Sequence, residues 1–330
     1  MHTHIIPKHL PKWTEKFGYG NFIHLEHVED GVADMMQGGK FFRRIQENCW
    51  NEDLRIKEYK QFHTQVQVVC TIPVLFSYWA KPEDCEELSK FLNDHIANLV
   101  SLYPKNYIGL GTIPMQDTET AIRELKRCKE IGLVGIQIGS NINTENLNEE
   151  KFFPIFEACQ ELGIAVLIHP WQMMGFDQLQ KYWLPWLVGM PAETSRAICS
   201  LIFGGIFEKL PRLRVAFAHG GGSFPSTIGR IEHGFACRPD LVAIDNQVNP
   251  RTYVGKFWFD SLVHDEKMLR FLVDFAGANR VALGSDYPFP LGENVPGFMI
   301  KQTDYSNEAK AQLLHGAALE WLQMNKANFI

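Results

Sequence analysis

Two histidines stand almost at the start of the chain, in the segment MHTH, with one residue between them. In a β-strand, side chains at positions i and i+2 point to the same side, and their Cα atoms lie about 6.6 Å apart. His2 and His4 can therefore hold one metal ion together. The pair alone also has an ordinary explanation, because chain ends are often poorly ordered and carry histidines without a role. Further ligands elsewhere in the chain are needed to decide.

Three more residues of metal-binding type follow short apolar runs later in the chain. His169 ends LIHP, His219 stands in FAHGGG and Asp286 in LGSDYP. Each alone predicts little, since an aspartate before a loop commonly forms a turn or caps a helix, and a histidine at a strand end is usually structural. Together with His2 and His4 they place five candidates at the ends of predicted strands. We interpret them as one site.

Three imidazoles and one carboxylate suit Zn²⁺ and leave one position for water. The sequence predicts one zinc ion per chain, bound by His2, His4, His169 and Asp286. Binding to zinc lowers the pKa of water to about 7, so a neighbouring His219 can take its proton at neutral pH as a general base. The segment VGIQIGS contains no lysine that could be carbamylated to bridge two ions. A single metal is therefore favoured.

Short β-type segments alternate with helical patterns along most of the chain. The segments are apolar almost throughout, which is typical of parallel strands covered on both faces. Between them lie amphipathic patterns that begin with Pro, Thr or Glu and end at Gly or Pro. This alternation predicts a single α/β domain over residues 1–330, a (β/α)8 barrel with its chemistry at the C-terminal ends of the strands. The predicted strands are 3–6, 66–72, 107–113, 134–140, 165–170, 214–219, 256–262 and 280–286.

Two long segments interrupt the alternation. Residues 7–50 follow strand 1 and contain FGYGNF and QGGKFFRR, and we interpret them as a small insertion domain over the barrel mouth. Residues 171–190, WQMMGFDQLQKYWLPWLVGM, form an aromatic-rich excursion of loop and helix after strand 5. Both excursions leave the C-terminal ends of strands, where barrel enzymes place their substrate-binding loops.

Composition excludes several classes of partner. The net charge is -6 and the 32 Lys and Arg residues form no blocks, which argues against binding to nucleic acid or to an anionic membrane surface. The sequence shows no signal peptide and no run of 18 apolar residues, so we expect a cytoplasmic protein. Its seven scattered cysteines include no C-x-x-C pair and are expected to be reduced thiols.

Arginines and aromatic residues near the predicted mouth indicate the kind of substrate. A guanidinium group binds a carboxylate through two parallel hydrogen bonds, so an arginine beside the metal would indicate a small anionic substrate. The candidates are Arg43 and Arg44 in GKFFRR and Arg230 in GRIEHGF. Four aromatic residues either line an apolar pocket or belong to the core, namely Trp171, Trp183, Trp186 and Phe289.

The order H-x-H, strand-5 His, strand-6 His and strand-8 Asp resembles the pattern of the amidohydrolase superfamily. Longer segments are similar to one metal-dependent decarboxylase family within it, the 2-amino-3-carboxymuconate 6-semialdehyde decarboxylases of tryptophan degradation through kynurenine. They include ENCW, FSYWAKPED, HPWQMM, YWLPWLVGMPAET, AHGGGSFP, HGFACRPDL and LGSDYPFPLGE. The likeness extends over nearly the whole chain.

The resemblance implies a zinc-dependent, nonhydrolytic C–C cleavage that releases CO2 and gives 2-aminomuconate 6-semialdehyde. It assigns catalysis to His219, which activates the zinc-bound water, together with Asp286. It implies a homodimer in which Arg230 reaches the neighbouring site and, with Arg43, holds substrate carboxylates. The same resemblance places Trp186, Phe289 and Met173 beside the substrate.

Other reactions on the same barrel remain open from the sequence. One alternative is a related metal-dependent decarboxylase of hydroxybenzoate-type acids, and another is a metal-dependent hydrolase. A deaminase is disfavoured because no second carboxylic acid stands at the strand ends. A purely structural zinc site would be closed and would have no base beside it, so His219 favours an enzyme.

Overall fold

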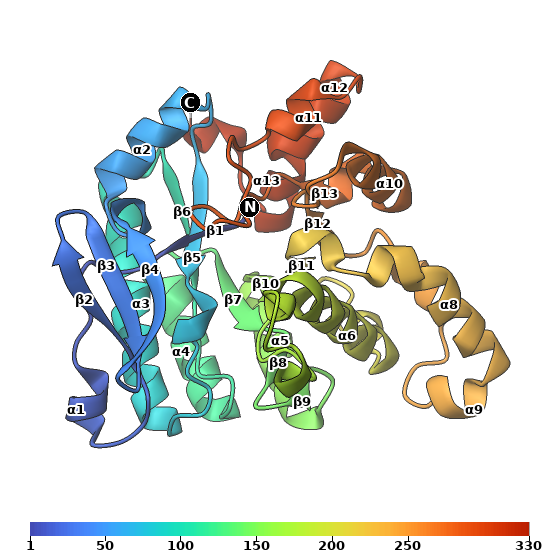
Figure 1. The fold of residues 1–330 in the computed structure, drawn as a ribbon. Helices are drawn as coiled ribbons and strands as arrows, with labels where there is room; N and C mark the ends of the chain where they lie inside the picture. The colour runs from blue at the N-terminus through green and yellow to red at the C-terminus, as the bar shows by residue number, and fades with distance from the viewer. Residues whose placement is uncertain (330) are drawn as a thin grey trace.

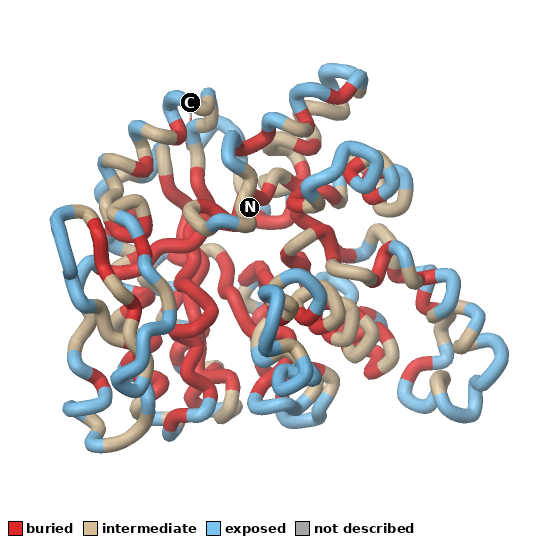
Figure 2. Tube along the Cα trace, in the orientation of Figure 1, coloured by how far each residue is buried: buried red, intermediate tan, exposed pale blue. Residues whose placement is uncertain are grey.

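The computed structural model describes residues 1–329, and its centre is a sheet of eight parallel strands (Figure 1). Neighbouring strands follow the order β1-β5-β6-β7-β10-β11-β12-β13. Their side chains are buried along their whole lengths, and Figure 2 shows these strands as the buried centre of the molecule. The strands are β1 (Thr3–Ile5), β5 (Gln67–Thr71), β6 (Tyr107–Gly111), β7 (Gly135–Gly139), β10 (Ala165–His169), β11 (Val215–Phe217), β12 (Trp258–Asp260) and β13 (Val281–Ala282).

The first strand also pairs with the segment that follows the last one, which closes the sheet. Thr3 forms a parallel bridge with Tyr287. The His4 N–H donates to the Tyr287 carbonyl (2.8 Å), and the Asp286 N–H donates to the His2 carbonyl (3.0 Å). A sheet whose edges pair with each other has no free edge. The predicted eight-stranded α/β barrel is confirmed.

The last strand is shorter than the predicted 280–286. After Ala282 the backbone leaves the ladder, and the Leu283 N–H donates to the Leu313 carbonyl (2.8 Å). Asp286 then takes a positive φ of 50°. The apolar pattern continues through this segment because the segment stays buried. Its later hydrogen bonds go to β1, and for this reason β13 ends early.

Helices surround the barrel, and two of them begin at aspartate caps. The Asp117 carboxylate accepts the Thr120 N–H (2.9 Å), and the Asp265 carboxylate accepts the Met268 N–H (2.9 Å), so both aspartates cap helices. The longer helices are α2 (Glu52–Gln61), α3 (Pro82–Leu102), α4 (Thr118–Glu130), α5 (Phe153–Leu162), α6 (Met190–Phe203), α8 (Phe224–Cys237) and α10 (Glu266–Ala276). The shorter ones are α7 (Ile206–Lys209), α9 (Pro239–Val242), α11 (Phe298–Gln302), α12 (Asn307–Ala311) and α13 (Ala317–Leu322).

The segment after β1 forms a small antiparallel sheet beside the barrel (Figure 1). It contains α1 (Trp13–Phe17), β2 (Ile23–Glu29), β3 (Val32–Gln37) and β4 (Lys40–Gln46). Trp13, Phe22 and Met35 of this segment share a buried cluster with Leu88 and Leu92 of α3. The insertion is therefore fixed to the barrel by apolar packing.

The excursion after β10 contains little regular structure. It has one helical turn at Phe176–Gln178 and a π-helical turn at Pro185–Gly189 that leads into α6. A short hairpin of β8 (Asn141–Ile142) and β9 (Glu145–Asn146) follows β7. Within residues 1–329, no helix has both the length and the apolar character to cross a membrane.

Candidate metal centre and active-site pocket

Four predicted ligands meet at the C-terminal end of the barrel. His2 and His4 come from β1, His169 ends β10, and Asp286 follows β13. One ligand atom from each residue lies within 4.8 Å of all the others, and all four residues are buried. The Nε2 atoms of His2 and His4 are 3.1 Å apart, and His4 Nε2 lies 3.0 Å from Asp286 Oδ1. These separations match neighbouring ligands of one ion at bond lengths of about 2.0–2.2 Å.

The three ligand histidines present the same ring nitrogen to this centre. His4 Nδ1 donates to the Thr71 carbonyl (2.9 Å), and His169 Nδ1 donates to the Pro170 carbonyl (2.9 Å). A carbonyl only accepts, so the proton is on Nδ1 and the Nε2 lone pair is free. His2 Nδ1 has a carboxylate as its partner, which gives the same tautomer. Three unprotonated nitrogens and a carboxylate fit a divalent cation.

Burial favours the neutral form of His2 and His169, the form in which a histidine binds a metal. It lowers the pKa of His2, and it lowers the pKa of His169 well below the usual value, with the neighbouring histidines adding to the effect. Burial opposes ionisation of Asp286, but contacts with His219 and His4 hold its pKa well below the usual range. The Asp286 carboxylate is therefore the one anion among these four side chains.

His219 lies beside the four ligands with one ring nitrogen unused. Its Nε2 is 3.8 Å from Asp286 Oδ2, and its ring centroid is 5.0 Å from that of His169. This nitrogen is buried and has no hydrogen-bond partner in the described part of the chain. The glycines after it take positive φ angles and pass close to β12, where a Cβ on Gly221 would lie 2.3 Å from the Phe259 ring. Burial opposes the charged form of His219, but the nearby Asp286 carboxylate raises its pKa, so the structure places an imidazole that can take up a proton next to the centre.

A cavity of about 500 Å³ opens onto the ligands His4, His169 and Asp286. Its walls are mainly aromatic and apolar, which is usual for a small-molecule site. The insertion contributes Gln37, Phe42 and Arg43, and the excursion contributes Trp171, Gln172, Met173, Phe176, Trp183 and Trp186. Phe289, Pro290 and Leu291 follow Asp286 and complete one wall.

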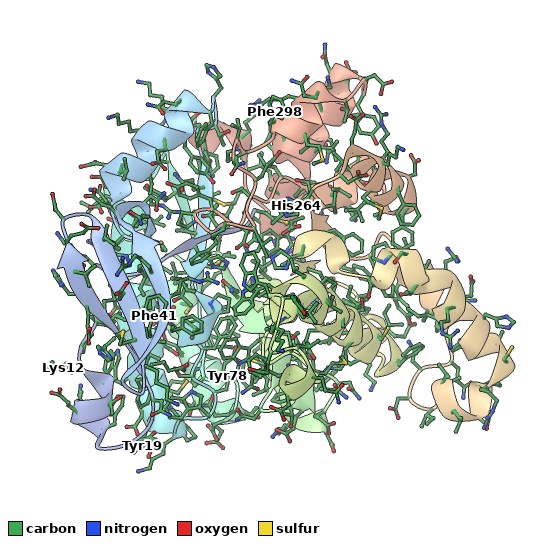
Figure 3. The ribbon with its side chains drawn as sticks, in the orientation of Figure 1. Lys12, Tyr19, Phe41, Tyr78, His264 and Phe298 are labelled. Atoms are coloured by element: carbon green, nitrogen blue, oxygen red, sulfur yellow. The ribbon has the colours of Figure 1, made fainter. Side chains whose placement is uncertain are left out.

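The two arginines of GKFFRR point in different directions. Arg43 lines the cavity, with its guanidinium carbon 4.7 Å from the Phe289 ring centroid and 5.8 Å from that of Trp186. Arg44 stands opposite Asp34 in the β3–β4 ladder and donates to both of its carboxylate oxygens (2.7 and 2.9 Å). Arg43 is therefore the cation available to a ligand. Phe41, labelled in Figure 3, precedes this pair on β4 and is exposed.

Arg230 does not reach this cavity within its own chain. It lies on α8 and is exposed to solvent. Helices α8 and α9 extend away from the barrel in Figure 1. The structure thus brings Arg43, Trp186, Phe289 and Met173 together and leaves Arg230 outside the group.

Residues 1–323 match the family model described as amidohydrolase. The chain belongs to the amidohydrolase family. This match confirms the superfamily that the order of ligands along the sequence indicates.

This amidohydrolase is similar to several curated decarboxylases. It is 58% identical over 332 residues to the 2-amino-3-carboxymuconate-6-semialdehyde decarboxylase of Dictyostelium discoideum, covering 100% of this chain and 92% of the relative. It is 36% identical over 377 residues to the protein of the same name from Caenorhabditis elegans, covering 99% and 94%. Among solved structures, 5-carboxyvanillate decarboxylase from Novosphingobium aromaticivorans, complexed with manganese, is 25% identical with a TM-score of 0.76, covering 84% of this chain and 82% of that chain.

One buried carboxylate of this amidohydrolase links a ligand to the predicted base, and the sequence analysis did not find it. Asp260 ends β12, and its Oδ2 accepts the His2 Nδ1–H (2.9 Å). Its Oδ1 accepts the Gly220 N–H (2.9 Å), directly after His219. A signal existed, because Asp260 stands near the C-terminal end of a predicted strand. It lies inside the apolar run KFWFDSL, not after it, and so it did not stand out.

A second buried carboxylate holds the excursion that forms one wall of the pocket. Glu193 is fully buried and accepts the Met174 N–H (2.7 Å), the Ser140 hydroxyl (3.2 Å) and the Asn141 side-chain amide (3.1 Å). Arg196 adds a charged hydrogen bond of 2.8 Å. These bonds tie the loop after β10 to the loop after β7. Tyr78, labelled in Figure 3, accepts the Gly139 N–H at the end of β7 (3.1 Å).

We predict that Asp260→Asn weakens metal binding by about 10- to 100-fold, the usual effect of losing a hydrogen-bond partner of a ligating histidine. The substitution keeps the size of the side chain but removes the charge that orients the His2 ring. The measurement is competition for Zn²⁺ against a chromogenic chelator. Asp274→Asn, an exposed site on α10, is the matched control. Equal affinities for the two variants would contradict the prediction.

Proposed function

We propose that this amidohydrolase is a metal-dependent carboxy-lyase of tryptophan degradation. It converts 2-amino-3-carboxymuconate 6-semialdehyde to 2-aminomuconate 6-semialdehyde and CO2. The observation that carries the proposal is the full-length match to the Dictyostelium decarboxylase at well over half of the positions. An open centre with a free base beside it and one arginine in an aromatic cavity supports this chemistry.

For the cation we propose zinc, one per chain, bound by His2, His4, His169 and Asp286. Three imidazole nitrogens with one carboxylate are a common zinc donor set. The solved 5-carboxyvanillate decarboxylase holds manganese, so elemental analysis of the purified protein decides between the two ions. When bound, the cation supplies Lewis-acid chemistry at the closed end of the cavity.

Arg43 binds a substrate carboxylate in this proposal. Its guanidinium group lies against the rings of Phe289 and Trp186, and the Asp34 carboxylate is already taken by Arg44. Aromatic walls exclude water, which strengthens a charged hydrogen bond at this position. The resulting orientation directs the substrate chain toward His169 and Asp286, which line the same cavity.

His219 handles the proton. In the reaction the bond between the substrate carbon and its carboxylate breaks, CO2 departs, and the electron pair stays on the carbon. A proton must then replace the carboxylate at that carbon. The Nε2 of His219 has no hydrogen-bond partner and lies 3.8 Å from Asp286 Oδ2, so it takes up a proton from solvent water and donates that proton to the carbon as a general acid.

The first experiment measures decarboxylation of freshly generated 2-amino-3-carboxymuconate 6-semialdehyde with and without a chelator. We expect absorbance loss with CO2 release, abolition by the chelator, and recovery when Zn²⁺ is restored. Turnover of 5-carboxyvanillate without turnover of this substrate would favour the hydroxybenzoate-type alternative. Full activity in a protein shown by elemental analysis to be free of metal would refute metal dependence.

A second prediction concerns Arg43. A hydrogen bond between charged groups contributes about 1.5–3 kcal/mol, so we expect Arg43→Met to lower kcat/KM by roughly 10- to 150-fold, mainly through KM. Arg44→Met is the matched control, because Arg44 is next in sequence but pairs with Asp34 on the exposed face. Steady-state kinetics of both variants provide the measurement. Similar losses in both would show that the effect comes from the β3–β4 sheet and not from substrate binding.

We also propose that the chain forms a homodimer in which Arg230 binds a substrate carboxylate in the neighbouring pocket. Support comes from the exposure of Arg230 on a helix that extends from the barrel. Apolar side chains that follow on the same arm, Leu241 and Ile244, are exposed as well. A second copy of the chain would cover them.

Mixing two inactive variants tests this arrangement. Arg230→Ala removes the contributed cation, and His219→Ala removes the base, so each homodimer is expected to be inactive. In a mixed dimer one pocket has both groups intact, and we expect up to about a quarter of the parental activity because half of the dimers are mixed and each has one complete site. The readout is the decarboxylase rate after subunit exchange. Absence of any recovery in proven mixed dimers would reject the shared site.

We propose a reducing, cytoplasmic location. All seven cysteines, which lie within residues 1–329, are free. Burial raises the pKa of Cys49 to about 11 and that of Cys85 to about 12. Such thiols are inert packing groups, which supports a compartment where disulfides do not form.

A further inference from the structure

Arg55 on α2 is a charged side chain buried completely inside the protein. Burying a charge is costly unless hydrogen bonds and an opposite charge compensate for it. In residues 1–329 every hydrogen bond of the Arg55 side chain that the structure shows goes to an uncharged oxygen. The role of Arg55 therefore lies in the groups to which its guanidinium donates hydrogen bonds.

One edge of the guanidinium group holds the first strand. Arg55 Nη1 donates to the carbonyl of His4 (2.7 Å) and to that of Asn48 (2.8 Å). Arg55 Nη2 donates to Gln67 Oε1 (2.9 Å) at the start of β5 and lies 3.4 Å from Thr3 Oγ1. The group thus ties β1, the end of the insertion and β5 together behind the ligand His4.

The same group also contacts the residue that follows the ligand Asp286. The guanidinium carbon of Arg55 lies 4.8 Å from the centroid of the Tyr287 ring, within the range of a cation–π contact. Tyr287 directly follows the ligand Asp286, and its carbonyl accepts the His4 N–H (2.8 Å). The His4 backbone is therefore held at its N–H by Tyr287 and at its carbonyl by Arg55.

A short strand makes this support necessary. β1 has three residues and pairs with β5 at three positions. Ligand placement within about 0.5 Å is needed for a productive site, and a strand this short has few backbone hydrogen bonds, those to β5 and to residues 285–287, with which to hold two ligands.

We propose that Arg55 is a positioning residue of the metal centre. It fixes the His4 backbone and the Tyr287 ring so that His2, His4 and Asp286 meet at one ion. This inference rests on the metal site of the proposed function. It predicts that changes at Arg55 act on metal affinity more than on folding.

Arg214 provides a matched control. It is also buried, and its guanidinium group also donates to two backbone carbonyls, those of Trp321 and Gly163. It precedes β11 and so lies at the opposite end of the barrel from the ligands. A purely structural role for a buried arginine predicts similar behaviour for the two residues.

The experiment compares Arg55→Lys, Arg55→Met and Arg214→Met in the full chain. Zn²⁺ affinity is measured by competition with a chromogenic chelator, and the melting temperature is recorded without metal and at one fixed, subsaturating Zn²⁺ concentration. We expect both Arg55 variants to bind Zn²⁺ at least about tenfold more weakly, with a smaller rise in melting temperature at a fixed, subsaturating Zn²⁺ concentration. Arg214→Met is expected to melt earlier than the parent yet to bind Zn²⁺ within about twofold of it.

Different results would overturn different statements. Parental Zn²⁺ affinity in Arg55→Met rejects the positioning role, and if this variant does not fold, the affinity of Arg55→Lys decides instead. Failure of both to fold while Arg214→Met folds also rejects it, because Arg55 would then support the whole barrel. An unmodified protein that binds no divalent cation at all would instead reject the metal site of the proposed function.

Discussion

The pairing of β1 with the segment after β13 is the contact on which the rest of the structure depends. The His2 carbonyl accepts the Asp286 N–H, and the Tyr287 carbonyl accepts the His4 N–H. These bonds close the barrel and at the same time bring the first and last ligands of the chain together. Separate hydrogen bonds to a carboxylate or a carbonyl orient the rings of His2 and His4. Fold closure and site assembly are thus one event, because ligands more than 280 residues apart in sequence are neighbours across the closing seam.

Burial of the ligand set imposes a second constraint. Neutral imidazoles are easier to bury than charged ones, and burial itself lowers the pKa of His2 and His169. Their Nδ1 protons are used by fixed acceptors, which leaves the Nε2 lone pairs directed at one another and at Asp286. Such an arrangement of acceptors is unfavourable by itself and becomes favourable around a cation.

Sequence periodicity predicted the barrel because six of its strands are nearly continuous apolar runs, which are typical of parallel strands covered on both faces. These strands are β5, β6, β7, β10, β11 and β12. Periodicity overestimated β13, where burial continues after the ladder hydrogen bonds have turned to β1. Periodicity could not decide which of Arg43 and Arg44 faces the cavity. That depends on the β3–β4 register and on its irregularity at Met35 and Met36. The sequence analysis missed Asp260 and Arg55 for a related reason. Their importance lies in partners that are distant in sequence, Gly220 for one and Tyr287 for the other.

The ligands and the pocket walls rest on different kinds of support. His4 and His169 stand on barrel strands, whose backbone is held on both sides by neighbours. Arg43 and Trp186 instead come from the insertion and the excursion, which pack on the barrel from outside. The excursion is held by Glu193, whose buried carboxylate accepts the Met174 N–H. Because these walls can change without disturbing strand pairing, one barrel can present pockets of different shape around the same four ligand residues.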